Sequence, residues 1–392
     1  MKKYIPLFSI QLCSALSTAL FSVALIGIIF NNAGSVSLLM ICMALPAIFF
    51  SRAIGNLLDK HSKKPLFIIA LSFELVLISI MLAGGLFAHN HFVYIFAFLT
   101  SAVNIFIDLL LQISVTELAK EKNYLKLNST LSLIENIGVI IGPIVGGYLI
   151  YQNNIPISFA VIFALYALMF MFTALLKISK LNIPAARADE DPKPDDAKAA
   201  SPKPKLYLRK IYLTVALFGF AISIINVTQI SFVISHYNTN ELGFGLTESA
   251  WGIGMSVGAF ILLILNKRLK QNFIFGLSFL VIGMATLALV VNLSFQTSLF
   301  LFLLIGMGNI IIAIVSTTFI QQIASSDGLG KSLGMKSAVF QASCIAAMAI
   351  TGFADWTVPA PPTLLFVASG IIFLLGSILA LLFFRKADAL KN

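Results

Sequence analysis

Charged residues are scarce in this sequence of 392 residues, of which 11% are Asp, Glu, Lys or Arg and 59% are hydrophobic. Soluble domains average about 25% charged residues, so the composition excludes an ordinary soluble protein and is typical of a membrane protein. Cysteine is also scarce, with three widely spaced residues in apolar runs, which excludes a disulfide framework and a cysteine-based zinc site. Phosphate-binding glycine loops, His-Glu-x-x-His sequences and nucleophile elbows are lacking, so we expect no enzyme activity, cofactor or metal.

Hydrophobic runs of about 20 residues, the length that crosses a bilayer core, occur twelve times along the chain. They predict transmembrane helices and exclude a barrel of alternating strands. The first six predicted spans are 5–30, 35–57, 65–88, 92–117, 127–150 and 155–176. The second six are 211–235, 247–265, 273–291, 297–321, 333–354 and 364–384.

The positive charges of the sequence fall on one side of this topology. If the N-terminus is inside and the chain crosses twelve times, all 26 Lys and Arg residues lie in inner segments. Cytoplasmic segments are enriched in Lys and Arg, so both termini are predicted to be cytoplasmic in a multi-pass protein of the cell inner (cytoplasmic) membrane. The net charge of +10 then reflects topology rather than a nucleic-acid partner. The same count leaves no Lys or Arg deep in a span.

One inner segment, 177–210, is long and rich in Pro, Ala, Lys and Asp, and it is predicted to be a flexible cytoplasmic linker. It separates an N-terminal bundle, 1–176, from a C-terminal bundle, 211–392. Transporters often consist of two such halves with the substrate site at their interface. The predicted fold class is an all-α membrane protein with twelve transmembrane helices in two six-helix bundles.

The stretch GNLLDKHSKK after the second span combines a glycine, an aspartate four residues later and a basic cluster. Glycine permits close helix approach, and aspartate can receive a cation or cap a helix N-terminus. Spacing and position resemble the loop 2–3 signature of the major facilitator superfamily, which implies a latch between the two bundles on the cytoplasmic side. The residues that carry the resemblance are Gly55, Asp59, Lys60, Lys63 and Lys64.

Glycines recur every four residues in the fifth span, a spacing that lets helices pack closely in lipid. The sequence GPIVGG also resembles the fifth-helix motif of exporters in this superfamily. The motif residues are Gly138, Gly142, Pro143, Gly146 and Gly147. The layout of the first half is similar to macrolide-efflux and siderophore-export proteins, whereas the second half resembles them poorly. The fourth span lacks the Arg that many drug and sugar transporters carry.

Three acids lie inside predicted spans, where a charge is costly and indicates function: Glu74, Asp108 and Glu135. Such a carboxyl group either carries a proton or faces water, and both conditions suit proton coupling or recognition of a cation. Asp108 is the first candidate because the fourth helix lines the cavity in the superfamily. Glu135 shares a face with the glycines, so a role in packing or gating is given the same weight as direct proton transfer. For Glu74, a peripheral position facing lipid or between helices is given the same weight as a functional one.

Polar residues in other spans are candidates for the substrate cavity, although each is individually more typical of a hydrogen bond between helices. The candidates are Gln11, Ser14, Thr18, Asn104, Gln112, Asn226, Gln229, Ser231, Asn309 and Gln341.

The resemblance implies a secondary transporter that works by alternating access. We expect proton-coupled export of an amphipathic small molecule, a drug or a siderophore-like metabolite. The expected partners are this small molecule, protons or another coupling ion, and the lipid bilayer, and the family implies a monomer. One alternative is an importer or flippase of a specific solute such as a siderophore, a lysophospholipid or a nutrient. Another is a non-transporting membrane receptor or scaffold.

Overall fold

The structure is a computed structural model. It describes residues 4–31, 36–84, 90–118, 123–152, 155–175, 203–237, 239, 241–265, 270–291, 293–325, 328–357 and 361–384.

Within these residues the chain forms twelve α-helices and no strand. The first six are α1 (Ile5–Asn31), α2 (Val36–Lys60), α3 (Lys63–Gly84), α4 (Asn90–Leu118), α5 (Tyr124–Tyr151) and α6 (Ile155–Leu175). The next six are α7 (Lys203–Tyr237), α8 (Glu241–Leu265), α9 (Gln271–Val290), α10 (Phe295–Ile323), α11 (Leu329–Thr357) and α12 (Pro362–Phe384). All twelve are long and apolar enough to cross a membrane, which confirms the predicted fold class. Helices satisfy every backbone polar group internally, as the water-free bilayer core requires.

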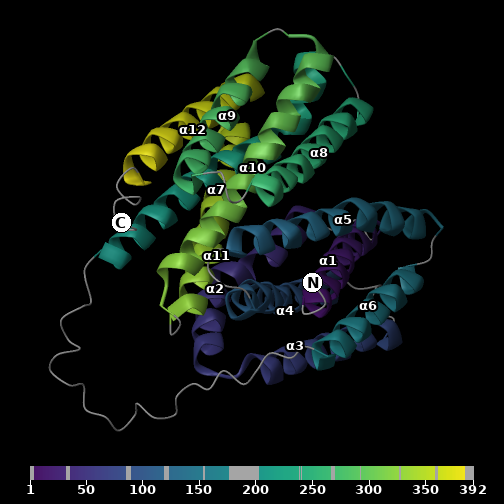
Figure 1. Cartoon of the computed structure of the whole chain (residues 1–392). Helices are drawn as coiled ribbons and strands as arrows, with labels where there is room; N and C mark the ends of the chain where they lie inside the picture. Colours follow the sequence, from purple (N-terminus) through teal and green to yellow (C-terminus); the bar gives the residue numbers. More distant parts are fainter. Residues whose placement is uncertain are drawn as a thin grey trace, which may run out of the picture.

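The helices form two bundles: bundle one, α1–α6, occupies the lower part of Figure 1, and bundle two, α7–α12, lies mainly in the upper part. In bundle one, α1 packs against α4, α5 and α6, while α3 packs against α4 and α6. In bundle two, α7 packs against α11 and α12, α8 against α10, and α9 against α10 and α12. The outer helices expose apolar side chains, for example Leu375, Ile378 and Leu382 on α12, which are 53%, 55% and 61% exposed. These faces are suited to contact with lipid tails.

The predicted linker is shorter at its C-terminal end than the composition suggested. Helix α7 begins at Lys203, eight residues before the predicted start of the seventh span, so the last eight residues of the predicted linker are helical. Pro204 does not oppose this extension, because proline is tolerated in the first turn of a helix, where its missing N–H has no partner in any case. The rest of the linker, 177–202, lies outside the described residues.

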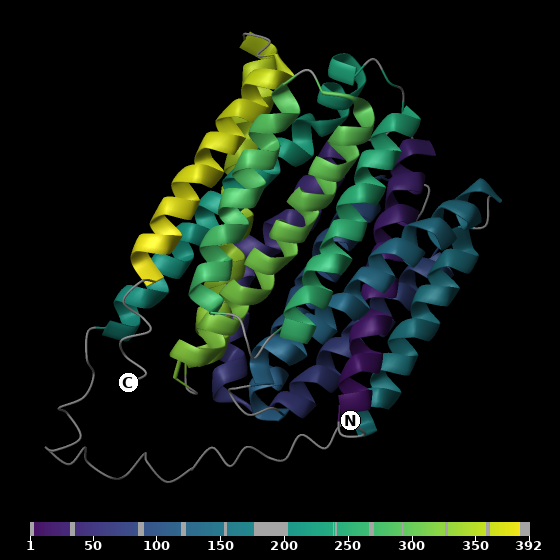
Figure 2. The same ribbon diagram turned by 45° about the horizontal axis from the view of Figure 1, so that its top comes forward.

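The two ends of the molecule differ in charge. Helix α2 ends at Lys60 and α3 begins at Lys63, and Lys270 and Lys331 lie at the starts of α9 and α11 on the same side. We call this side the basic end and the other side the opposite end. Because the number of spans is even, α1 begins and α12 ends at the basic end, as Figure 2 shows.

The glycines of α5 bring this helix into close contact with α1. A Cβ atom built on Gly138 would lie 2.3 Å from Cβ of Ala15, and one built on Gly142 would lie 2.4 Å from Cβ of Ala19. A Cβ on Gly146 would lie 3.1 Å from Val23. The stripe therefore packs two helices of the same bundle. Pro143 and Gly147 fall in the same helix, and their surroundings lie outside the described part of the structure.

Candidate functional site

Asp59 connects the two bundles at the basic end. It lies near the end of α2, and its carboxylate accepts the backbone N–H groups of Gly330 (2.6 Å) and Lys331 (2.9 Å) at the start of α11. The first N–H groups of a helix have no partner within the helix, and the helix dipole favours a negative charge there. Asp59 therefore caps a helix of the other bundle, a partner that the sequence did not predict.

Glycines make this cap possible because they allow the backbones of α2 and α11 to touch. A Cβ on Gly55 would lie 2.0 Å from the carbonyl oxygen of Gly330, and a Cβ on Gly334 would lie 2.0 Å from that of Ser51. We call Gly55, Asp59, Gly330 and Lys331 the latch. Of the predicted basic residues, Lys60 is exposed and Lys64 donates to the carbonyl of Ala174 on α6, within bundle one. Lys63 begins α3.

A second connection between the bundles is a set of amide and hydroxyl groups that we call the clasp: Gln112, Asn128, Thr318 and Gln321. Asn128 of α5 donates to the side-chain oxygens of Thr318 (2.9 Å) and Gln321 (2.7 Å) on α10. Gln321 in turn donates to the backbone carbonyl of Gln112 on α4 (2.8 Å). Asn128 and Gln321 are buried, so their paired amides hold three helices together.

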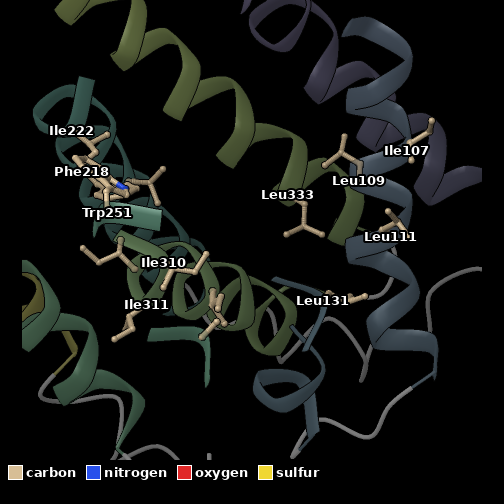
Figure 3. Close-up of a cluster of buried hydrophobic side chains, with 14 of the residues drawn as sticks. Ile107, Leu109, Leu111, Leu131, Phe218, Ile222, Trp251, Ile310, Ile311 and Leu333 are labelled. Atoms are coloured by element: carbon tan, nitrogen blue, oxygen red, sulfur yellow. The ribbon is translucent and has the colours of Figure 1, made fainter. Parts of the chain in front are cut away.

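Apolar side chains surround these polar contacts. Figure 3 shows Leu111 and Leu131 of bundle one in the same buried cluster as Leu333 of α11. Farther along α5, Asn136 lies 3.5 Å from the hydroxyl of Ser256 on α8. The residues of the latch, the clasp and this contact all fall in the half of their helices nearer the basic end. The bundles of the described structure are thus joined on the basic side.

Three ionisable side chains lie just beyond the clasp, and we call them the charged trio: Asp108 of α4, Glu135 of α5 and Lys336 of α11. Counted at 1.5 Å per residue, Asp108 is about 15 Å from the basic end of its helix and Glu135 about 16 Å. Glu135 interacts electrostatically with both Asp108 and Lys336. Both carboxyl side chains are exposed, although they lie on helices that contact the other bundle.

Lys336 corrects a prediction, because the charge count had assigned it to an inner segment and left no cation deep in a span, although the predicted span 333–354 includes it. It is the eighth residue of α11, and its ammonium group donates to the hydroxyl of Thr317 and to the carbonyl of Ala313 (3.4 Å) on α10. Counting positive charges by side could not distinguish a loop lysine from one about two turns inside a helix. The signal that would have placed it was already in the sequence, because position 336 falls inside the predicted span 333–354.

Glu74 lies away from the charged trio. Its side chain is 0% exposed and lies on α3, which contacts α4 and α6 of bundle one. The neighbouring groups are Thr100 of α4 and Tyr166 of α6. The structure therefore places Glu74 inside bundle one rather than facing lipid.

The predicted cavity residues do not form one group. Asn104 accepts a hydrogen bond from the Tyr166 hydroxyl (2.8 Å), and Gln229 donates to Thr247 (3.0 Å). Gln11 and Ser14 are buried, whereas Asn226 and Ser231 are exposed. Thr18, Gln112, Asn309 and Gln341 are half-buried. Two of the candidates thus hold neighbouring helices together within a bundle.

Nearly the whole chain resembles a known family of membrane transport proteins. The Major Facilitator Superfamily matches residues 7–348. No curated protein matches the sequence.

Solved transporters share the fold. A bacterial homologue of the iron transporter ferroportin in an outward-facing state has a TM-score of 0.78 at 14% identity, over 99% of this chain and 100% of that one. The human organic anion transporter MFSD10 (TETRAN) has a TM-score of 0.75 at 14% identity, over 96% and 98%. The E. coli fucose:proton symporter FucP has a TM-score of 0.73 at 15% identity, over 98% and 98%. At these identities the likeness concerns the fold alone.

Proposed function

This chain belongs to the Major Facilitator Superfamily, and from that premise we propose that it exports an amphipathic small molecule in exchange for protons. The substrate class is that of the macrolide-efflux and siderophore-export proteins which the first half resembles. The basic end faces the cytoplasm, as the distribution of Lys and Arg favours, and the protein acts as a monomer in the inner membrane.

The observation that carries this proposal is the position of the charged trio relative to the clasp. Asp108 and Glu135 are exposed, while the paired amides of Asn128 and Gln321 lie between them and the basic end. We infer that the carboxyl groups are reached from the opposite end in this conformation. Alternating access requires that they be reached from the basic end in another, after the clasp and the latch have opened.

Asp108 is the coupling residue in this proposal. Glu135 has a cation nearby in Lys336, whereas Asp108 interacts with the like charge of Glu135. A proton on Asp108 removes that repulsion, and a cationic group of a substrate removes it equally well. Proton and substrate then compete for one carboxyl group, which is the condition for exchange rather than co-transport.

Lys336 sets the response of the bundles to this competition. It belongs to bundle two, and it bonds to Thr317, the residue next to Thr318 of the clasp. A change of charge at Asp108 and Glu135 alters the electrostatic attraction on Lys336. Because Lys336 bonds to α10, that change also affects the hydrogen bonds of the clasp on α10, which close the basic end.

The test is proton flux in proteoliposomes that contain the purified full-length protein and a pH-sensitive dye. Amphipathic cations, siderophores and lysolipids are added in turn, and an exchanger changes the internal pH when its substrate is added. We expect Asp108→Asn to abolish that change. Glu248→Gln is the matched control, because this acid of α8 lies near Gln229 rather than near the trio. Wild-type flux in Asp108→Asn would contradict the proposed coupling.

A further inference from the structure

Glu74 is a buried acid that the proposed exchange does not use. Its side chain is 0% exposed, and neither carboxyl oxygen has a hydrogen-bond partner. Thr100 of α4, also 0% exposed, lies beside it without reaching hydrogen-bonding geometry. No Lys or Arg among the described residues interacts with the group.

Tyr166 of α6 connects this acid with the substrate route. The tyrosine side chain is 0% exposed, and its hydroxyl donates to Oδ1 of Asn104 on α4 at 2.8 Å. It interacts electrostatically with Glu74 and with Asp108. On α4 and α6, the helices packed against α3, the titratable groups of this cluster are therefore Asp108 and Tyr166.

The residues on α4 follow the helix repeat. Thr100, Asn104 and Asp108 are spaced by four, so they lie on one face, one turn apart. We call these three residues the polar file. Thr100, with Glu74 beside it, is at one end of the polar file, and Asp108, about 12 Å farther along the axis, is at the other. The file leads from the interior of bundle one to the charged trio.

We propose that Glu74 is a second proton-binding site, set inside bundle one and coupled to Asp108 through Tyr166 and the polar file of α4. An ionised carboxylate with no cation and no hydrogen-bond donor is unfavourable in a buried site, and binding a proton makes it neutral. Both acids interact with Tyr166, and like charges that share a neighbouring group repel each other, so in this proposal charge on Asp108 opposes charge on Glu74. Bundle one then keeps a proton on Glu74 while Asp108 exchanges its own.

This inference rests on the proposed function only in that Asp108 exchanges protons. The bound proton itself is detected by infrared spectroscopy of the purified full-length protein, without any substrate. A protonated carboxyl group has a carbonyl stretching band that an ionised carboxylate lacks, and the band shifts when H₂O is replaced by D₂O. We expect such a band at neutral pH, lost in Glu74→Gln and kept in the control Glu248→Gln.

Two further variants test the coupling. Tyr166→Phe keeps the buried ring and removes only the hydroxyl, so we expect the Glu74 band to shift in frequency. Asp108→Asn removes the charge of the other acid that interacts with Tyr166, so we expect the Glu74 band to shift in frequency in this variant as well. If Glu74→Gln does not fold, the frequency shift in Tyr166→Phe identifies the band instead.

Each outcome has a distinct meaning. If no band is lost in Glu74→Gln, the proton site is overturned. Where that variant does not fold, the absence of any band that shifts in Tyr166→Phe would overturn it instead. A Glu74 band that neither Tyr166→Phe nor Asp108→Asn alters would overturn the coupling. Neither result depends on proton flux through Asp108, so failure here is distinguishable from failure of the proposed exchange.

Discussion

Replacing Gly55 by alanine should open the basic end of the protein. The added Cβ would lie 2.0 Å from the carbonyl oxygen of Gly330, whereas ordinary contact begins at 3.4 Å. The Cβ is held rigidly by the backbone of α2 and the oxygen belongs to the backbone of α11, so the two helices themselves must separate, by about 1.4 Å if they move directly apart.

The energetic effect follows from that separation. The hydrogen bonds from Gly330 and Lys331 to Asp59 are 2.6 and 2.9 Å long, and lengthening them by this amount breaks both. Overpacking costs about 1–3 kcal/mol, and a hydrogen bond to a charged group contributes about 1.5–3 kcal/mol. Because water replaces part of the lost bonding, we expect a net change on the order of 3 kcal/mol, about a hundredfold in the ratio of closed to open conformations.

Spin-label distances can measure this change. One label pair, His61→Cys with Ser325→Cys, reports on the basic end, and another, Gln152→Cys with Val291→Cys, reports on the opposite end. All four sites are exposed and the pairs join the two bundles. The background protein has its three native cysteines replaced by alanine, since all three are unpaired thiols.

In Gly55→Ala the distance at the basic end should lengthen and the distance at the opposite end should shorten. The matched control is Gly252→Ala in α8, where an added Cβ meets nothing within 4 Å. Identical distance distributions in Gly55→Ala, Gly252→Ala and the parent protein would show that the contact between α2 and α11 does not hold the basic end closed.

Three other substitutions test separate parts of the structure. Asp59→Asn keeps one acceptor but loses the negative charge at the start of α11, a charge–dipole interaction worth about 0.3–2 kcal/mol. The distribution of spin-label distances at the basic end should broaden and transport should fall. An unchanged distribution would show that Asp59 does not hold the two bundles together. Gly142→Val places a side chain against Ala19, only 2.4 Å from the new Cβ, so the melting temperature should drop relative to Gly252→Val; equal melting temperatures would contradict the packing of α5 on α1. Lys336→Met removes the cation near Glu135 and should reduce proton flux. The double variant Glu135→Gln/Lys336→Met should recover part of the flux. If the loss of flux in the double variant equals the sum of the losses in the two single variants, the two residues do not act as a functional charge pair.

Much of the fold could be predicted because lipid imposes simple rules. Twelve apolar runs gave twelve helices, since a helix is the way to satisfy the backbone in a bilayer. The glycine spacing in α5 indicated close packing but not its partner, α1. Helix α7 begins within the predicted linker, because polar composition argues against a span but does not prevent helix formation beyond the membrane.

The candidate site was less predictable, because its contacts join residues far apart in sequence. Asp59 could be identified from local spacing, but its partners lie 271 and 272 residues away. Lys336 was counted with the inner segments, although it falls inside the predicted span 333–354, because topology counting uses only the side on which a charge falls. Tyr166 lies in an apolar run, and nothing local distinguishes it from a core aromatic residue. Only the packing of α6 on α3 and α1 brings it near two acids.

Substrate-dependent proton flux is the most direct test of the proposed exchange through Asp108. The wild type and Glu248→Gln, reconstituted in proteoliposomes, should show a pH change with at least one of the amphipathic cations, siderophores or lysolipids, and Asp108→Asn should show none. Absence of flux with every compound, together with unchanged behaviour of Asp108→Asn and Glu135→Gln, would contradict proton-coupled export by this protein.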